Sequence, residues 1–193
     1  MSAIILDYIP FTATLDTFVE RMRIQNRRSA KEELAELLEE AIPLARPKVM
    51  FLEAKIAQKG DGFIVIEGLT LTSQALRETV DALTRVFPVV VTCGTELATW
   101  ASGVDGLFSR FCADVICEAA MCSAQEYLTR YVAERFSAAP ITYILPGTLD
   151  WPMEAQKQLF TLVGDTEPIG VTLTAHNTMR PIKTVSALYY EQM

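Results

Sequence analysis

The sequence contains no long hydrophobic run. Its longest apolar stretch, VFPVVVTC at residues 86–93, is much shorter than the roughly 20 residues that a membrane-spanning helix needs, and Pro88 interrupts it. The first residues, MSAIILDYIPF, lack the positive charge with which signal peptides begin, and they include Asp7. We therefore expect a cytoplasmic protein that does not act at a membrane.

Positive charge is also scarce. Lys and Arg together number 17 against 24 Asp and Glu, which gives a formal net charge of −7. Nucleic-acid-binding proteins depend on positive charge to contact phosphates, so this class is excluded. Half of the residues are apolar, as is typical of a globular protein, and 193 residues are enough for one domain with a substantial core.

Residues that commonly form catalytic or metal centres are few and far apart. His176 is the only histidine, and the four cysteines include no C-x-x-C pair. Cys112, Cys117 and Cys122 recur every five residues, a spacing that spreads them around a helix instead of aligning them. We expect small buried thiols, reduced in a cytoplasm, and a structural role for the lone histidine. The residues alone predict no catalytic group and no metal site.

The first half of the chain predicts helices and strands in mixed order. A helix should begin at Ser29, which forms a capping-box pattern with Glu32, and continue to about residue 41. Two β-prone runs within 48–67 flank a Lys-Gly-Asp-Gly turn and predict a hairpin. The next expected elements are a helix from Thr72 or Ser73 that stops by Pro88, a buried strand at 89–93 and a helix after Gly94-Thr95-Glu96. One long helix should follow over 107–136. Its first half is apolar over most of its circumference and should therefore run through the core.

The stretch ITYILPGTLDWPMEAQKQLF, residues 141–160, predicts a strand, a Pro-Gly turn and a helix that Asp150 and Pro152 start. Such a turn is either a plain connection or a small-molecule site, because glycine turns and helix N-termini offer free backbone N–H groups. Strands at 169–174 and 184–190 follow a helix that ends near residue 163. Together the elements predict a single α+β domain with a largely antiparallel sheet and a long buried central helix, and residues 1–28 as an N-terminal extension packed on it.

Several stretches, taken in order, resemble the activation (reactivation) domain of vitamin B12-dependent methionine synthase, and specifically small stand-alone proteins similar to it. The likeness extends from about residue 29 to 189 and includes PLARPKVMFLEAKI, FIVIEGLTLTSQAL and ADVICEAA. It is most specific near the C-terminus, in these pairs and patterns: Pro146-Gly147, Asp150-Trp151-Pro152, Gln156-Lys157, Ile169-Gly170-Val171, Leu173-Thr174 and Met179-x-Pro181-x-Lys183-x-x-Ser186.

The resemblance implies a function. In that family the Pro-Gly turn borders a site for S-adenosylmethionine, and the domain docks over a corrinoid that another module holds. An electron from a flavodoxin-type partner reduces oxidised cobalt, and S-adenosylmethionine then methylates it, so the chemistry mainly requires orientation and exclusion of water. The chain would be an accessory component of methionine biosynthesis, with cobalamin present only through a corrinoid-binding partner or methionine synthase module. The implied ligand-binding residues are Tyr143, Pro146, Gly147, Thr148, His176, Met179, Pro181, Lys183 and Ser186.

The family turn is not fully conserved in this sequence. The family has Arg-x-x-x-Gly-Tyr there, whereas this chain has Tyr143 at the arginine position and Thr148 at the tyrosine position. Three hypotheses follow: a reactivation protein that binds S-adenosylmethionine, a non-catalytic partner of a corrinoid protein that has lost this ligand, and a small-molecule-binding regulatory domain on the same fold. From the matched C-terminal pattern we predict that segments 143–151 and 176–186 line one concave site, with Gly147 and Pro181 at its wall.

Overall fold

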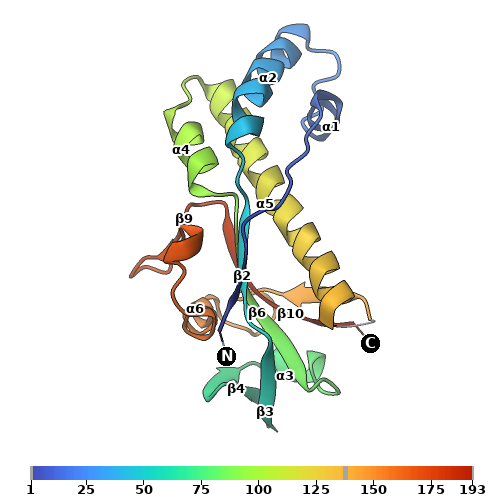
Figure 1. Ribbon diagram of the computed structural model, residues 1–193, viewed down its shortest axis with the longest axis vertical. Helices are drawn as coiled ribbons and strands as arrows, with labels where there is room; N and C mark the ends of the chain where they lie inside the picture. Colours follow the sequence, from blue (N-terminus) through green and yellow to red (C-terminus); the bar gives the residue numbers. More distant parts are fainter. Residues whose placement is uncertain (1, 137–138, 193) are drawn as a thin grey trace.

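The computed structural model describes residues 2–136 and 139–192. Its helices and strands alternate irregularly along the chain (Figure 1). The α-helices are α1 (Leu15–Arg21), α2 (Arg28–Ala41), α3 (Gln74–Thr79), α4 (Thr95–Gly103), α5 (Leu107–Phe136) and α6 (Gln156–Val163), and the short 3-10 helices are η1 (Ile42–Leu44), η2 (Met153–Ala155) and η3 (Glu167–Ile169). The strands are β1 (Ile4–Leu6), β2 (Lys48–Phe51), β3 (Ala54–Gly60), β4 (Phe63–Ile66), β5 (Leu69–Thr72), β6 (Arg85–Thr92), β7 (Ile141–Ile144), β8 (Thr172–Leu173), β9 (Met179–Arg180) and β10 (Thr184–Glu191).

Strand β6 is the centre of an eight-stranded sheet in which every described pair is antiparallel. It pairs with β2 and β3 along one side and with β10 along the other. Strand β1 extends the sheet beyond β2. Strands β4 and β5 extend it beyond β3, and β7 extends it beyond β10. The prediction of an α+β fold with a largely antiparallel sheet is confirmed, as is the hairpin within 48–67, which turns at Asp61 and Gly62.

The region around Pro88 differs from the prediction. The helix expected from Ser73 toward Pro88 ends at Thr79, and β6 begins at Arg85, so that the proline lies inside the central strand. Proline normally disrupts a central strand because it cannot donate a ladder hydrogen bond. Here the carbonyl of Pro88 accepts from the N–H of Leu52 at 3.0 Å, in the interruption between β2 and β3. In an antiparallel strand the N–H of a residue points to the same side as its carbonyl, so the missing donor falls at this interruption.

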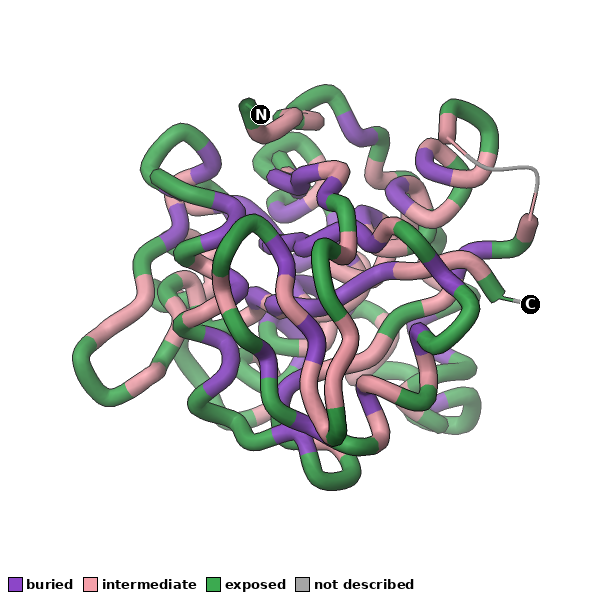
Figure 2. Tube along the Cα trace, turned by 90° about the horizontal axis from the view of Figure 1, so that it is seen from below, coloured by how far each residue is buried: buried purple, intermediate pink, exposed green. Residues whose placement is uncertain are grey.

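The predicted long helix is confirmed with both its ends, as α5, and it contributes to two parts of the core. Cys112, Ile116 and Cys117 pack among α1, α2 and α4 at one end of the molecule. Further along α5, Leu128 and Val132 pack on the sheet against Phe51, Phe87 and Tyr189. Figure 1 shows the helix running from the helical end across the sheet, and Figure 2 shows that the buried residues gather in the interior of the trace. The helix buries one stripe and leaves Leu107 and Phe111 exposed.

Residues 2–28 pack on both parts of the protein. Strand β1 pairs with β2 at the edge of the sheet, with Ile5 opposite Met50. Helix α1 buries Phe18 and Val19 in the same cluster as α2. The predicted capping box at Ser29 is wrong, because α2 already begins at Arg28 and Ser29 lies within its first turn.

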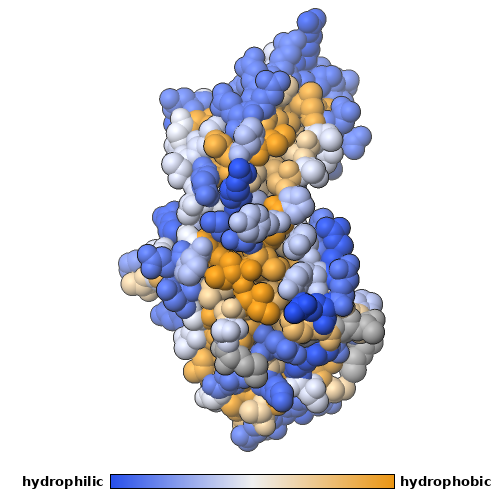
Figure 3. All heavy atoms as spheres, viewed as in Figure 1, coloured by the Kyte–Doolittle hydropathy of each residue, from blue (hydrophilic) through white to orange (hydrophobic). Residues whose placement is uncertain are grey.

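Apolar residues also gather on the outer surface near the middle of the view in Figure 3, over the sheet.

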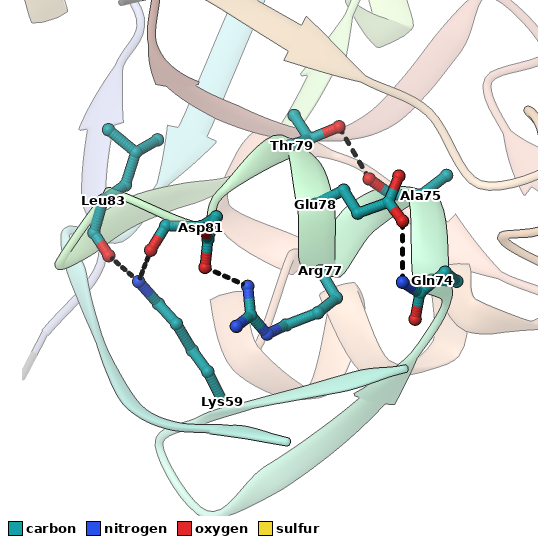
Figure 4. Close-up of polar contacts among 8 residues, drawn as sticks. All are labelled: Lys59, Gln74, Ala75, Arg77, Glu78, Thr79, Asp81 and Leu83. Carbon is teal, nitrogen blue, oxygen red and sulfur yellow. Dashed lines mark hydrogen bonds and ion pairs between the residues drawn. The ribbon is translucent and has the colours of Figure 1, made fainter. Parts of the chain in front are cut away.

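Polar contacts join β3 to the segment that follows the short helix α3 (Figure 4). The Lys59 ammonium donates to the carbonyl oxygens of Asp81 and Leu83, at 2.5 Å each. The Arg77 guanidinium donates to the carboxylate of Asp81 at 2.5 Å, and this hydrogen bond is the main reason that the pKa of Asp81 lies below its ordinary value. Among the described residues, no helix has the length and apolar character required to cross a membrane.

Candidate functional site

A cavity of about 440 Å³ lies between α4, α5 and the segment 180–183 that leads into β10. This volume falls within the range of small-molecule sites. Strand β6 ends beside it, and Gly94 then turns the chain into α4 with a φ of 94°. A Cβ atom at Gly94 would lie 2.3 Å from the carbonyl oxygen of Arg46, so only glycine fits this turn. Helix α4, which begins after this turn, lines the cavity with Ala98, Ala101 and Ser102.

Lys183 fixes the relation between α5 and the start of β10. Its ammonium contacts the carboxylates of Asp114 at 2.9 Å and Glu118 at 3.3 Å, both on α5. Its backbone carbonyl accepts from the N–H of Cys93 at 3.0 Å. Burial disfavours the charged form of Lys183, but the hydrogen bonds with Asp114 and Glu118 outweigh it and raise the pKa of the lysine. The positive charge of Lys183 is therefore largely neutralised within the protein.

Two further cations line the cavity. The guanidinium of Arg110 pairs with Asp105 at 2.9 Å and also donates to the Val104 carbonyl. Arg180 is exposed and precedes Pro181 through a cis peptide bond. The apolar parts of the lining come from small residues of α4 and from Pro181 and Ile182. The lining thus combines apolar surface with charged groups, of which Lys183 and Arg110 are already paired with carboxylates.

The cavity also contains two thiol groups. Cys93, at the end of β6, and Cys117, on α5, both line it, although neither side chain is appreciably exposed. The Cys93 thiol contacts the carbonyl oxygen of Gly94 at 3.5 Å, and the Cys117 thiol contacts that of Leu97 at 3.8 Å. Both acceptors belong to the beginning of α4, so the thiols lie side by side beneath this helix.

The predicted ligand turn lies elsewhere along β10. Tyr143 pairs with Tyr189, and their rings stack with centroids 5.0 Å apart. Tyr143 is 42% exposed, whereas Pro146 is buried. Tyr189 lies six positions after Lys183, about 20 Å along an extended strand. None of residues 143–151 lines the cavity that contains Pro181 and Lys183. The predicted single site for the two segments stays a prediction.

Internal hydrogen bonds close the Pro-Gly turn. The N–H of Gly147 donates to the Trp151 carbonyl at 2.8 Å, and the N–H of Thr148 donates to the Leu145 carbonyl at 3.2 Å. Gly147 has a φ of 88°, and a Cβ atom there would lie 2.6 Å from the terminal methyl carbon of Met153. The N–H groups of Gly147 and Thr148 are thus already used within the turn, and the Met153 side chain lies against the exposed glycine.

The other predicted residues fall in three places. His176 is exposed in the turn between β8 and β9, which the hydrogen bond from the Thr174 N–H to the Thr178 carbonyl closes. Met179 is half-buried in β9. Ser186 is buried in β10 opposite Val90 of the central strand. Only Pro181 and Lys183 of the predicted set line the cavity.

The contributions of α4 and α5 to the cavity are absent from the sequence predictions. The sequence predicts only a helix start at Gly94-Thr95-Glu96, and for Cys117 a buried thiol on the same helix as Cys112 and Cys122. The cavity joins Cys93, Cys117 and Lys183, three residues far apart in the chain, and no local pattern connects them. A weak signal was present, because Cys93 directly precedes a strand-to-helix glycine turn.

No protein-family model matches the sequence, and a comparison with curated proteins gives no match. Among solved structures, the crystal structure of the MetH reactivation domain bound to AdoHcy is similar, with a TM-score of 0.72. The match covers 99% of this chain and 78% of that one, at 13% sequence identity. The chain has the fold of the MetH reactivation domain. This finding confirms the resemblance that the C-terminal patterns indicated, and with it the fold of a MetH reactivation domain over nearly all of the sequence.

Proposed function

We propose that this protein binds S-adenosylmethionine, or its product S-adenosylhomocysteine, and supports reductive methylation of the corrinoid of a separate methyltransferase or methionine synthase. The observation that carries the proposal is the structural match to a MetH reactivation domain whose crystal structure contains AdoHcy. The match extends over 99% of the chain, so it includes the 143–148 turn and the 176–186 segment. The Pro146-Gly147 and Met179-x-Pro181 patterns, which resemble those of the family, also support it.

The residues of the turn fit part of such a ligand. The stacked pair Tyr143–Tyr189 presents a half-exposed aromatic face, which suits a flat purine ring. S-adenosylmethionine would supply an activated methyl group to the reduced cobalt of the partner's corrinoid, and S-adenosylhomocysteine would remain. The work of the protein in that reaction is to orient the two reactants and to keep water away from them. Such a role requires positioned surfaces more than acid or base groups.

A second function has support from the same turn. The N–H groups of Gly147 and Thr148 are used within the turn, and Tyr143 replaces the arginine that would bind a carboxylate. A charge-assisted arginine contact cannot be replaced by a tyrosine hydroxyl. These observations favour a protein that docks on a corrinoid protein without binding the methyl donor. Either way the partner is a corrinoid-binding protein, and a flavodoxin-type donor would supply the electron.

Calorimetric titration with S-adenosylmethionine and S-adenosylhomocysteine separates the two functions. Saturable binding supports the reactivation protein, and absence of binding leaves the docking partner. Methyl transfer is then measured with labelled S-adenosylmethionine, a reductant and a corrinoid protein in its cob(II) state, with and without this chain. Label on the corrinoid that depends on the chain is the expected result. If the chain neither promotes labelling nor forms a complex with the corrinoid protein, both functions are wrong.

A further inference from the structure

The cavity between α4, α5 and segment 180–183 is separate from the turn at 143–148. Its lining comes from the end of β6, from α4, from the first half of α5 and from the residues that follow β9 (Figure 1). None of residues 143–151, all of which the structure describes, belongs to it. A ligand in this cavity would therefore occupy a second site with residues of its own.

Contacts within the protein hold the walls of this cavity in place. The Lys183 ammonium contacts the carboxylates of Asp114 and Glu118 on α5, at 2.9 and 3.3 Å, and so fixes segment 180–183 to that helix. The buried thiol of Cys117 contacts the carbonyl oxygen of Leu97 at 3.8 Å and joins α5 to α4. The cavity is thus preformed, and a ligand would not have to order its walls on binding.

The charges around the cavity are of both signs and they balance. Two of the three cations in its lining form ion pairs with carboxylates that lie outside the lining. Three positive and three negative charges result when these partners are included: Arg110, Arg180 and Lys183 against Asp105, Asp114 and Glu118. A ligand with a net charge would disturb this balance, whereas a zwitterion would preserve it.

Two charged groups of the lining remain available to a ligand. The guanidinium of Arg180 is exposed and has no ion pair or hydrogen bond with any residue that the structure describes. Asp114 contacts Lys183 through Oδ2, which leaves Oδ1 for another donor. A guanidinium binds a carboxylate through charge-assisted hydrogen bonds, and a carboxylate oxygen accepts from an ammonium. Arg180 and Asp114 can therefore hold the two charged ends of one zwitterion.

The uncharged part of the lining is mostly apolar. Helix α4 contributes Ala98 and Ala101, and the segment after β9 contributes Pro181 and Ile182. Ile182 is 68% exposed, so the protein itself covers little of this large apolar side chain. An apolar group of a ligand that packed on it would remove its surface from water.

We propose that this cavity binds a free amino acid with an apolar side chain. The guanidinium of Arg180 binds the carboxylate, Asp114 accepts from the ammonium, and the apolar side chain packs between α4 and Ile182. The cavity volume of about 440 Å³ leaves room for the larger apolar side chains. This inference goes beyond the proposed function and does not depend on it, because it uses no residue of the 143–148 turn.

The test is calorimetric titration and thermal unfolding of the whole chain with single amino acids. L-leucine, L-methionine and L-phenylalanine should bind saturably and raise the unfolding temperature as their concentration increases. Two analogues of leucine serve as matched probes: isoamylamine lacks the carboxylate, and isocaproate lacks the ammonium. Each loses one charge-assisted contact and should bind roughly 10-fold more weakly than leucine, or weaker still.

Two variants locate the binding. Arg180→Gln should weaken leucine binding by roughly 10-fold or more, and Ala101→Leu should weaken it by filling part of the cavity. The matched control is Arg130→Gln, which removes an exposed arginine of α5 outside the cavity and should bind leucine as the wild type does. Circular dichroism establishes that each variant is folded.

The absence of saturable binding by all three amino acids overturns the proposal. Binding that Arg180→Gln and Ala101→Leu both leave unchanged overturns it too, and so does equal affinity for leucine and its two analogues. S-adenosylmethionine titrated in the presence of saturating leucine should bind as it does alone, because its proposed site is separate. Displacement of one by the other would place both in one site and contradict a second site, without deciding against the proposed function.

Discussion

The carboxylate of Asp150 accepts a hydrogen bond from the hydroxyl of Ser73 at 2.5 Å, although 77 positions separate the two residues. Asp150 also accepts from the backbone N–H groups of Gln74, at 2.7 Å, and Ala75, at 3.1 Å. These are N–H groups at the start of α3 that have no partner within the helix. The turn after β7 therefore caps a helix of another part of the fold, and the sequence prediction that Asp150 starts its own helix is wrong.

Ser73→Ala should destabilise the protein. Ser73 is the N-cap of α3, and its hydroxyl oxygen accepts from the Leu76 N–H at 2.9 Å while it donates to Asp150. Loss of an N-cap side chain costs about 0.5–2 kcal/mol in the free energy of unfolding. This loss is measured by urea unfolding monitored with circular dichroism. The slope of the unfolding free energy against urea concentration should stay unchanged. A matched control is Ser102→Ala at the exposed end of α4, which should have a much smaller effect; equal effects would contradict the capping role.

Asp150→Asn should remove part of the acid sensitivity of the fold. The hydrogen bond from Ser73, followed by the backbone N–H groups, holds the pKa of Asp150 below its ordinary value of 3.8. A lowered pKa in the folded state means that the carboxylate stabilises the fold at pH values above 3.8, and that this contribution disappears as the pH falls through the folded-state pKa. As the pH falls from 7 to 2, the thermal unfolding midpoint should thus decline less for Asp150→Asn than for the wild type.

The control for this pH dependence is Asp81, whose pKa is also lowered, chiefly by its hydrogen bond with Arg77. Asp81→Asn should reduce the decline through a different contact. If the thermal stability of Asp150→Asn fell with pH as much as that of the wild type, the charge of Asp150 would not contribute to the capping of α3.

Gly147→Ala should weaken the turn after β7. Alanine is strained at a φ of 88°, and its Cβ atom would lie 2.6 Å from the terminal methyl carbon of Met153. The expected loss of stability is about 1 kcal/mol or more. The double variant Gly147→Ala with Met153→Ala removes the contact but keeps the backbone strain, so it should recover only part of that loss. Full recovery would show that the side-chain contact alone makes glycine necessary.

Tyr143→Arg should strengthen the binding of S-adenosylmethionine. A charge-assisted hydrogen bond to the ligand carboxylate is worth about 1.5–3 kcal/mol, which corresponds to roughly 10- to 150-fold in affinity. The new guanidinium can also stack on Tyr189, as the tyrosine ring does in the wild type. Calorimetric titration of both proteins measures the change, with Tyr143→Phe as the control that keeps the ring without a charge. Tight binding by the wild type that Tyr143→Arg abolishes would place Tyr143 in a differently built site.

The sequence was most informative where one segment carried its own signal. The apolar pattern of 107–136 defined α5 to its ends because it persists for 30 residues, and the Asp61-Gly62 turn identified the β3–β4 hairpin. Pro88 misled the prediction, because its effect on a strand depends on what lies opposite. The interruption between β2 and β3, which accommodates it, exists only after the sheet has formed.

The candidate site was less accessible to sequence reasoning for the same reason. The family pattern predicted Pro181 and Lys183. Asp114 and Cys117 line the cavity because of how α5 is oriented relative to the rest of the fold, which no sequence pattern gives. The cap formed by Asp150 depends on the position of β7 beside β10. Contacts between distant segments leave no periodic pattern, and therefore only the three-dimensional arrangement reveals them.

Helix α5 belongs to the helical core through Ile116 and to the sheet core through Leu128. A helix shared in this way couples the unfolding of the two halves, because neither half can lose its packing without exposing the apolar stripe that the other half needs. Amide protons at both ends of the molecule should consequently exchange with solvent through one global opening. A binding partner that stabilises either half would then slow exchange in the other half as well.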